Sequence, residues 1–189
     1  MEKEEARREI RRRIEALTPS ERAAKSEAVR ARLLSLPEMS DANTIMAFLA
    51  MPDELDTRPM IEAMIAAGKR VYVPHTLASE RRMIPVRIKG FKDLRTGAYG
   101  IAEPDSDETC RPEDIDFIIV PARAFDRRGN RLGRGAGFYD RFMTEDGFRA
   151  VRCGIGFACQ VLPSVPQEAH DLPVQILVTE DEVLRMPHR

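Results

Sequence analysis

The residue types best suited to chemistry gather in segment 124–141, which reads AFDRRGNRLGRGAGFYDR. Glycine occupies alternate positions near its middle, at Gly133, Gly135 and Gly137. Because glycine has no Cβ, backbone N–H groups in such a stretch can approach an oxyanion without steric interference. The spacing therefore predicts a loop that binds phosphate groups.

Charged side chains around these glycines suit the same ligand. Arg131 and Arg134 carry guanidinium groups, whose forked donors match phosphate oxygens. Asp140 follows about one helical turn later, where a carboxylate could hold a Mg²⁺ ion that bridges the phosphates. The alternative is a glycine-rich turn with solvated arginines, since the segment matches neither the P-loop nor the dinucleotide-binding pattern.

The elements on either side would put this segment where α/β proteins bind ligands. Residues 117–120 form a continuous apolar run typical of a buried strand, and a helix is expected from near Gly137 to Gly147. In open α/β sheets, the crevice beyond the carboxyl ends of the strands holds the ligand. The strand–loop–helix order therefore favours a binding site over a solvated turn.

Hydrophobic periodicity predicts the rest of the framework. An N-terminal helix is expected to end near Thr18, where a Thr18–Glu21 capping box starts a second helix that Pro37 closes. A third helix, with Pro59 in its first turn and Gly68 as its C-cap, links two strands in a βαβ unit. Buried strands are predicted at 44–50, 71–73, 83–88, 117–120, 151–157 and 175–179.

Composition narrows the class of protein. The chain has 189 residues, of which 43% are apolar and 32% charged, as in a folded globular domain. A formal net charge of -1 predicts neither a nucleic-acid nor a membrane partner. No apolar run approaches the roughly 18–20 residues of a membrane span, and the charged N-terminus lacks a signal-peptide pattern. Cys110, Cys153 and Cys159 lack metal-type spacing and indicate idle thiols in a reducing compartment, the cytoplasm.

The signature segment also resembles a known family. Residues 125–141 are similar to the signature of 5-formyltetrahydrofolate cyclo-ligase, also called methenyltetrahydrofolate synthetase. Three other parts resemble the same family in the same order: Lys3 with Arg7 near the N-terminus, FLAMPDELDT at 48–57 and GAYGIAEP at 97–104. The resemblance thus covers nearly the whole chain.

The resemblance implies roles for particular residues. ATP would contact Lys3, Arg7 and the run Arg131, Leu132, Gly133, Arg134, Gly135, Ala136, Gly137, Phe138 and Tyr139. The folate would contact Leu49, Glu54, Arg134, Gly135, Gly137 and Phe138. Arg134 and Asp140 would be the catalytic residues, and Asp140 and Asp171 would bind Mg²⁺.

Pattern alone gives several of these positions a plainer interpretation. Lys3 and Arg7 would be charges on a solvated helix face, and Leu49 would be a core strand residue. Glu54 would belong to a polar turn, and Asp171 would cap one.

The function implied by the resemblance is cyclisation of a reduced folate. ATP- and Mg²⁺-dependent conversion of 5-formyltetrahydrofolate to 5,10-methenyltetrahydrofolate would release ADP and phosphate through a phosphorylated formyl intermediate. Folate and ATP would be the partners of a monomer or weak homodimer. Pattern and resemblance together predict one domain over residues 1–189, a three-layer α/β/α fold with a mainly parallel, Rossmann-like sheet and the N-terminal helices packed alongside.

Two departures from the family pattern keep other functions open. Ala136 stands where many members carry Lys, and Phe138 stands where many carry Tyr. One alternative is therefore a nucleotide-binding relative without turnover. Another is an enzyme of related architecture that grips the phosphate of a sugar phosphate or a coenzyme A ester without transferring it.

Overall fold

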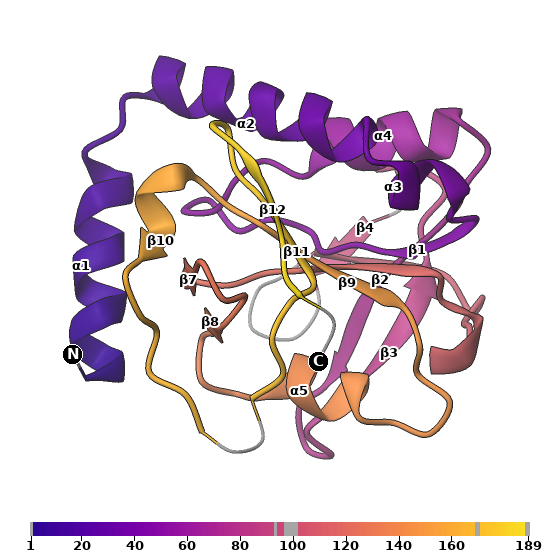
Figure 1. Ribbon diagram of the computed structural model, residues 1–189. Coiled ribbons are helices and arrows are strands. Elements are labelled where there is room, and N and C mark those ends of the chain that lie inside the picture. The colour runs from indigo at the N-terminus through magenta and orange to yellow at the C-terminus, as the bar shows by residue number, and fades with distance from the viewer. Residues whose placement is uncertain (1, 93, 97–101, 169–170, 188–189) are drawn as a thin grey trace.

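A seven-stranded sheet forms the centre of the protein in a computed structural model that describes residues 2–92, 94–96, 102–168 and 171–187 (Figure 1). Across the sheet lie β12 (Val183–Arg185), β11 (Ile176–Val178), β9 (Val151–Ile155), β6 (Phe117–Val120), β1 (Thr44–Met46), β2 (Arg70–Leu77) and β3 (Arg82–Arg87). The five strands from β11 to β2 are parallel, and antiparallel β12 and β3 form the two edges. The predicted mainly parallel sheet is confirmed.

Helices cover both faces of this sheet. Because successive strand residues point to opposite faces, Phe117 and Ile119 of β6 join one buried apolar cluster, whereas Ile118 joins another. The first cluster draws on the helices α1 (Lys3–Glu15), α2 (Pro19–Leu34), α3 (Pro37–Asp41) and α4 (Arg58–Ala66). The second includes Phe142 and Met143 of α5 (Phe138–Met143). In Figure 1, α2 and α4 lie above the sheet and α5 below it, which gives the three predicted layers.

The order of the parallel strands explains where a ligand can bind. Numbered along the chain, these strands lie in the order 2-1-3-4-5, which is that of flavodoxin-like sheets and not the 3-2-1-4-5-6 order of Rossmann folds. The Rossmann-like part of the prediction is therefore not confirmed. β1 pairs with β2 on one side and with β6 on the other, so the chain order reverses between β1 and β6. The carboxyl ends of these two strands flank the crevice expected at such a switch point.

The predicted capping box of α2 and the predicted glycine cap after α4 are confirmed. Thr18 Oγ1 accepts the backbone N–H of Glu21, and the Glu21 carboxylate accepts the N–H of Thr18, which completes the capping box at the start of α2. Gly68 follows α4 with a φ of 79°, as a glycine C-cap requires. Figure 1 shows α1 standing at the side of the sheet, beside β7 and β10, as the prediction of flanking helices requires.

Several predicted boundaries are wrong: the strand expected at 71–73 runs to Leu77, and the one expected at 151–157 ends at Ile155. β1 ends at Met46 and not at residue 50, because the next residues leave the sheet: Phe48 O accepts the Thr57 hydroxyl at 2.7 Å, and Ala50 N donates to it at 3.0 Å. The apolar run continues past the strand because it lines a cavity. α5 ends at Met143 and not at Gly147. The next residue, Thr144, caps the helix by donating its hydroxyl to the carbonyl of Arg141.

Short strands outside the central sheet were not predicted. A three-stranded sheet has the order β10 (Val161–Leu162), β7 (Ala124–Asp126) and β8 (Arg131–Leu132), so the signature segment supplies two of its strands. β4 (Leu94–Thr96) pairs with β5 (Ala102–Pro104), and the 3-10 turns η2 (Pro112–Asp114) and η3 (Ala158–Gln160) complete the fold. The β7–β8 hairpin matters most, because it separates β6 from the glycines and carries them.

The three cysteines form no disulfide with one another. Cys153 is buried, Cys110 and Cys159 are half-buried, and all three thiols are free. Burial raises the pKa of Cys110 to about 12, so this thiol stays protonated at neutral pH. Within the described ranges, no helix has the length and apolar character needed to span a bilayer. The interpretation of residues 1–189 as one domain stays a prediction.

Candidate active site

A cavity of about 640 Å³ opens at the carboxyl ends of β1 and β6, where the strand order places it. Its volume lies within the roughly 300–1,000 Å³ typical of small-molecule sites. It is lined by Lys3, Arg7, Phe48, Leu49, Met51, Glu54, Val73, Pro74, Thr76, Met83, Ala102, Pro121, Ala122, Arg131, Leu132, Gly133, Arg134, Gly135, Ala136, Gly137, Phe138, Tyr139, Asp140, Glu168 and Asp171. One end of the cavity is thus charged and the other is mostly apolar.

The glycine loop, residues 133–137, forms one wall of the charged end. Gly135 and Gly137 have φ values of 105° and 66°, which L side chains rarely adopt. None of the backbone N–H groups of residues 133–137 donates a hydrogen bond to any residue that the structure describes. Two carbonyl groups of the loop accept hydrogen bonds from neighbouring guanidinium groups. Arg7 Nε donates to Gly133 O at 3.1 Å, and Arg141 Nη2 donates to Ala136 O. The loop is left with unused donors beside a cavity, which is the arrangement that an anion requires.

Arg131 lies behind this loop as a buried cation. Its side chain is 4% exposed; Nη2 bonds Asp140 Oδ1 at 2.6 Å, and Nη1 bonds Leu172 O at the same distance. Asp140 Oδ1 also accepts the backbone N–H of Leu172 at 3.1 Å. Burial lowers the pKa of Arg131, while the charge of Asp140 opposes that shift. The pair therefore ties β8, the first turn of α5 and the 171–172 segment together at the charged end.

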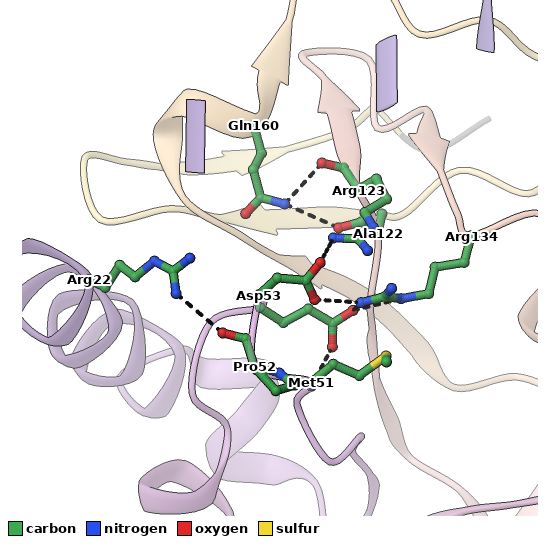
Figure 2. Close-up of polar contacts among 9 residues, drawn as sticks. Arg22, Met51, Pro52, Asp53, Ala122, Arg123, Arg134 and Gln160 are labelled. Atoms are coloured by element: carbon green, nitrogen blue, oxygen red, sulfur yellow. Dashed lines mark hydrogen bonds and ion pairs between the residues drawn. The ribbon is translucent and has the colours of Figure 1, made fainter. Parts of the chain in front are cut away.

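Arg134 reaches from the glycine loop to the segment after β1. Its Nη2 group bonds Asp53 Oδ1 at 2.9 Å and Glu54 Oε1 at 2.8 Å, and its Nε bonds Glu54 Oε1 at 3.2 Å. Figure 2 shows the guanidinium groups of Arg134 and Arg123 at the two oxygens of the Asp53 carboxylate. Burial alone would lower the pKa of Arg134, but the hydrogen bonds and charges of the two carboxylates raise it overall. Arg134 thus connects the two ends of the cavity.

Lys3 brings the start of α1 to the charged end. Its ammonium lies 2.7 Å from Glu168 Oε1 and 3.6 Å from Asp171 Oδ2. The hydrogen bond to Glu168 raises the pKa of Lys3, against a smaller opposing effect of burial. Asp171 Oδ2 also accepts the backbone N–H of Glu168 at 2.8 Å. Among the described residues, no three acidic, His or Cys side chains gather closely enough to hold a metal ion without another ligand.

Two aromatic side chains, those of Tyr139 and Phe138, belong to the wall of the cavity. The hydroxyl of Tyr139 is buried and has no hydrogen-bond partner among the described residues. Burial raises the pKa of Tyr139, so the hydroxyl keeps its proton at neutral pH. A buried hydroxyl without a partner costs free energy, so a group that hydrogen-bonds to it would stabilise this part of the site. Phe138 lies beside it under the guanidinium of Arg141, 5.5 Å from the ring centre.

The structure brings together every residue that the sequence suggested for the site. All of them, from Lys3 to Asp171, line the same cavity, including Leu49, which was also expected to be a core strand residue. Of the GAYGIAEP segment, residues 97–101 lie outside the described residues, and Ala102 lines the cavity. The roles assigned to individual residues stay predictions.

Sequence reasoning missed two kinds of site residue. Val73, Thr76 and Met83 come from β2 and β3, and a β-branched or apolar strand residue carries no signal that it faces a cavity. Glu168 lies in a polar, proline-containing stretch that matched no motif. Asp53 could have been found from its position beside Glu54, since both follow the same strand.

A polar crevice at the switch point of a mainly parallel sheet is the usual active-site position in α/β enzymes. Residues 1–180 match the family model described as the 5-formyltetrahydrofolate cyclo-ligase family. The chain belongs to this family and is an enzyme of the ligase class.

Individual relatives agree over nearly the full length. The chain is 34% identical to the 5-formyltetrahydrofolate cyclo-ligase of Escherichia coli strain K12 over 179 residues, which cover 92% of this chain and 98% of the relative. Identity to the Mus musculus enzyme of the same name is 27% over 186 residues, 93% of this chain and 92% of that one. The solved structure of 5,10-methenyltetrahydrofolate synthetase from Aquifex aeolicus superimposes with a TM-score of 0.87 at 33% identity, over 100% of this chain and 95% of that one.

Proposed function

We propose that the protein converts 5-formyltetrahydrofolate to 5,10-methenyltetrahydrofolate, consuming ATP with Mg²⁺ and releasing ADP and phosphate. The observation that carries the proposal is the glycine loop, which lines one cavity together with apolar side chains and whose backbone N–H groups have no acceptor among the described residues. One end suits a triphosphate and the other suits a flat ring system. The names of the relatives supply the substrate, and the geometry is consistent with it.

The reaction divides into an activation and a ring closure. The formyl oxygen on N5 attacks the γ-phosphorus of ATP, the new O–P bond forms, and the bond to the bridging oxygen of ADP breaks. N10 then attacks the formyl carbon and loses its proton. The C–O bond breaks with release of phosphate, which leaves the N5–C–N10 bridge of the methenyl product. Phosphorylation is needed because an amide oxygen cannot otherwise leave.

Residues at the charged end would position and neutralise the triphosphate. Phosphoryl transfer depends on alignment and charge stabilisation more than on a covalent protein nucleophile. The N–H groups of the glycine loop would bind phosphate oxygens, with Lys3 and Arg7 reaching the nucleotide from α1. Arg134 would stabilise the transferred group, because it extends from the glycine loop to Glu54 on the folate side. Arg131 would support this arrangement from behind through its pair with Asp140.

Residues at the apolar end would hold the folate. Phe48, Leu49, Val73 and Met83 line this part of the cavity and suit the faces of a pterin ring. Glu54 is the acidic side chain beside them, and a carboxylate pairs well with the N–H donors of a pterin. The folate would thus be oriented with its formyl group toward Arg134.

Asp140 and Asp171 fit a magnesium ion in chemical type. Mg²⁺ in nucleotide sites is usually bound by one or two carboxylates together with phosphate oxygens and water. Both side chains line the charged end, and both already contact cations, Arg131 and Lys3. They would therefore hold the ion jointly with ATP, where it would neutralise charge on the phosphates.

The departures at Ala136 and Phe138 leave this site intact. Ala136 is exposed on the glycine loop, and its missing lysine charge is offset by Arg7 and Arg134 nearby. Phe138 retains an aromatic ring on the cavity wall. We also propose that the chain acts as a single domain in the cytoplasm, as a monomer or weak homodimer.

A coupled assay tests the proposed function. Pure protein is mixed with 5-formyltetrahydrofolate and ATP, with Mg²⁺ or with a chelator, and methenyl absorbance and ADP are followed together. The expected result is growth of absorbance with one ADP per product, only when Mg²⁺ is present. Absence of both signals with Mg²⁺ would refute the proposal.

A further inference from the structure

Two acidic residues after β1 hold the same guanidinium, but only one of the two lines the cavity. Arg134 contacts both Asp53 and Glu54. Of these two residues, Glu54 lines the cavity and Asp53 does not. Asp53 therefore contacts the same Nη2 group as Glu54 but from outside the cavity lining, with its side chain 38% exposed.

Asp53 is itself fixed by a second arginine. Its Oδ2 forms an ion pair with Arg123 Nη1, and the Arg123 side chain is only 12% exposed. The backbone of Arg123 is held on both sides: its N–H donates to Leu132 O at 2.7 Å, and its carbonyl accepts Gln160 Nε2 at 3.0 Å. Figure 2 shows the row from Gln160 through Arg123 and Asp53 to Arg134. Burial would raise the pKa of Asp53, but its two arginine partners lower it overall, so the carboxylate stays ionised.

Substrate binding would change the role of Glu54 but not that of Asp53. Glu54 Oε2 accepts the N–H of Met51 at 2.9 Å and Oε1 accepts both contacts from Arg134, so a bound ligand would compete for the lone pairs of this carboxylate. A pterin that donates hydrogen bonds to Glu54 would weaken two of the three contacts that hold Arg134. The contact to Asp53 would remain, because Asp53 lies outside the cavity.

We propose that Asp53 is a positioning residue, which holds Arg134 at the junction of the two substrates once Glu54 is engaged by the folate. This inference rests on the proposed function. Arg134 acts on the transferred phosphoryl group, and Asp53 acts through Arg134. Within the described part of the chain, the Nη1 group of Arg134 has no hydrogen-bond partner, which leaves it available to a phosphate oxygen while Nη2 contacts Asp53.

The substitution Asp53→Asn tests this role by kinetics. In the absence of ligand Glu54 still holds Arg134, so the variant should fold. With both substrates bound, a displaced guanidinium should lower kcat by about ten-fold while the KM for the folate changes by less than about two-fold. The matched control is Asp56→Asn in the same segment, since Asp56 accepts the N–H of Arg58 and contacts neither arginine of the row. This control should keep kcat within about two-fold of the unsubstituted protein.

A double-substitution cycle separates positioning from a general structural role. In an Arg134→Lys background, Asp53→Asn should have almost no further effect on kcat, because the two residues act as one unit. Arg123→Gln should reproduce the kinetic effect of Asp53→Asn. The proposal would be overturned if Asp53→Asn and Arg123→Gln both left kcat unchanged. It would also be overturned if the fall in kcat of the double variant equalled the product of the separate falls in Asp53→Asn and Arg134→Lys.

A measurement without turnover keeps this inference distinct from the proposed function. The Nε–H signal of Arg134, assigned by its loss in Arg134→Lys, is followed by NMR as 5-formyltetrahydrofolate is added without ATP. The signal should shift and stay sharp in the unsubstituted protein, and should broaden or move toward that of a solvated arginine in Asp53→Asn. Identical titrations would refute the role of Asp53, whereas an inactive but folate-binding protein would refute only the proposed reaction.

Discussion

Two neighbouring turns of the same segment use glycine in opposite ways. In the hairpin turn between β7 and β8, residues 126–130, the N–H groups are used internally: Arg128 and Asn130 donate to the buried carboxylate of Asp126, and Gly129 donates to its carbonyl. In the glycine loop, residues 133–137, no backbone N–H donates within the described chain.

The surroundings of the two turns differ in the same sense. A Cβ on Gly129 would lie 2.4 Å from the carbonyl oxygen of Val174, inside packed backbone. A Cβ on Gly135 would meet only the guanidinium of Arg7, at 3.6 Å. The hairpin turn is therefore a structural element that carries the segment, and the glycine loop is the part that it presents to a ligand. Four predictions, from the largest expected effect to the smallest, test this division.

Asp140 connects the supporting structure to the ligand site, so Asp140→Asn should have the largest effect. The change would leave the buried cation Arg131 without its carboxylate and remove a proposed ligand of Mg²⁺. We expect kcat to fall by about 1,000-fold. The coupled absorbance and ADP assay measures it, with the exposed Asp146→Asn as the matched control. Near-normal turnover would remove Asp140 from the site.

The glycines of the two turns provide a direct contrast. Gly129→Ala should lower the free energy of unfolding by about 3 kcal/mol, because a positive φ and a backbone clash both oppose the new Cβ. Gly135→Ala should cost less stability but raise the KM for ATP about ten-fold, the equivalent of one charge-assisted hydrogen bond. Urea unfolding measures the stability of both variants, and steady-state kinetics measures their KM for ATP. Equal effects on stability and on KM would contradict the division of roles.

Arg7 tests whether α1 supports the glycine loop. Arg7→Gln removes the hydrogen bond to Gly133 O and a charge beside the cavity. The KM for ATP should rise by about five-fold, while kcat and the thermal midpoint change little. Arg8→Gln, which alters the exposed neighbour on the same helix, is the control. An equal rise in KM in both variants would assign the effect to general charge and not to the loop contact.

The smallest expected effect concerns stability, where the ion pairs of Asp53 should produce a pH dependence. Its arginine partners outweigh burial and lower its pKa from the ordinary value of 3.8, so the stabilisation is present above that value and is lost as the pH falls through the lower folded-state pKa. The stability difference between the unsubstituted protein and Asp53→Asn should therefore be constant above about pH 5 and shrink below pH 4. Chemical unfolding at several pH values measures it. A difference that grows toward acid pH would contradict the ion pairs.

Sequence patterns predicted the parts of the fold that local rules determine. The capping box at Thr18 and the glycine after α4 depend on a few adjacent residues, so they could be read directly. The end of β1 could not be predicted, because Phe48 and Leu49 are apolar residues that line the cavity and lie beyond the last strand residue, Met46. A cavity wall and a buried strand give the same pattern.

The site was predictable where its chemistry is compact in sequence. The glycine loop and its arginines are contiguous, whereas Lys3 and Asp171 meet only because the chain folds back over 168 residues. The β7–β8 hairpin left a weak signal, since an Asp followed three residues later by Gly is common in turns. The contact between Asp53 and Arg134 could be found only in the structure, because no sequence pattern links the two segments.

The most direct test is a crystal structure with Mg²⁺, a non-hydrolysable ATP analogue and 5-formyltetrahydrofolate. The triphosphate should lie against the N–H groups of residues 133–137, with its γ-phosphate between Arg134 and the formyl oxygen. A nucleotide bound elsewhere, with the glycine loop still making no contact to any phosphate, would contradict the assignment.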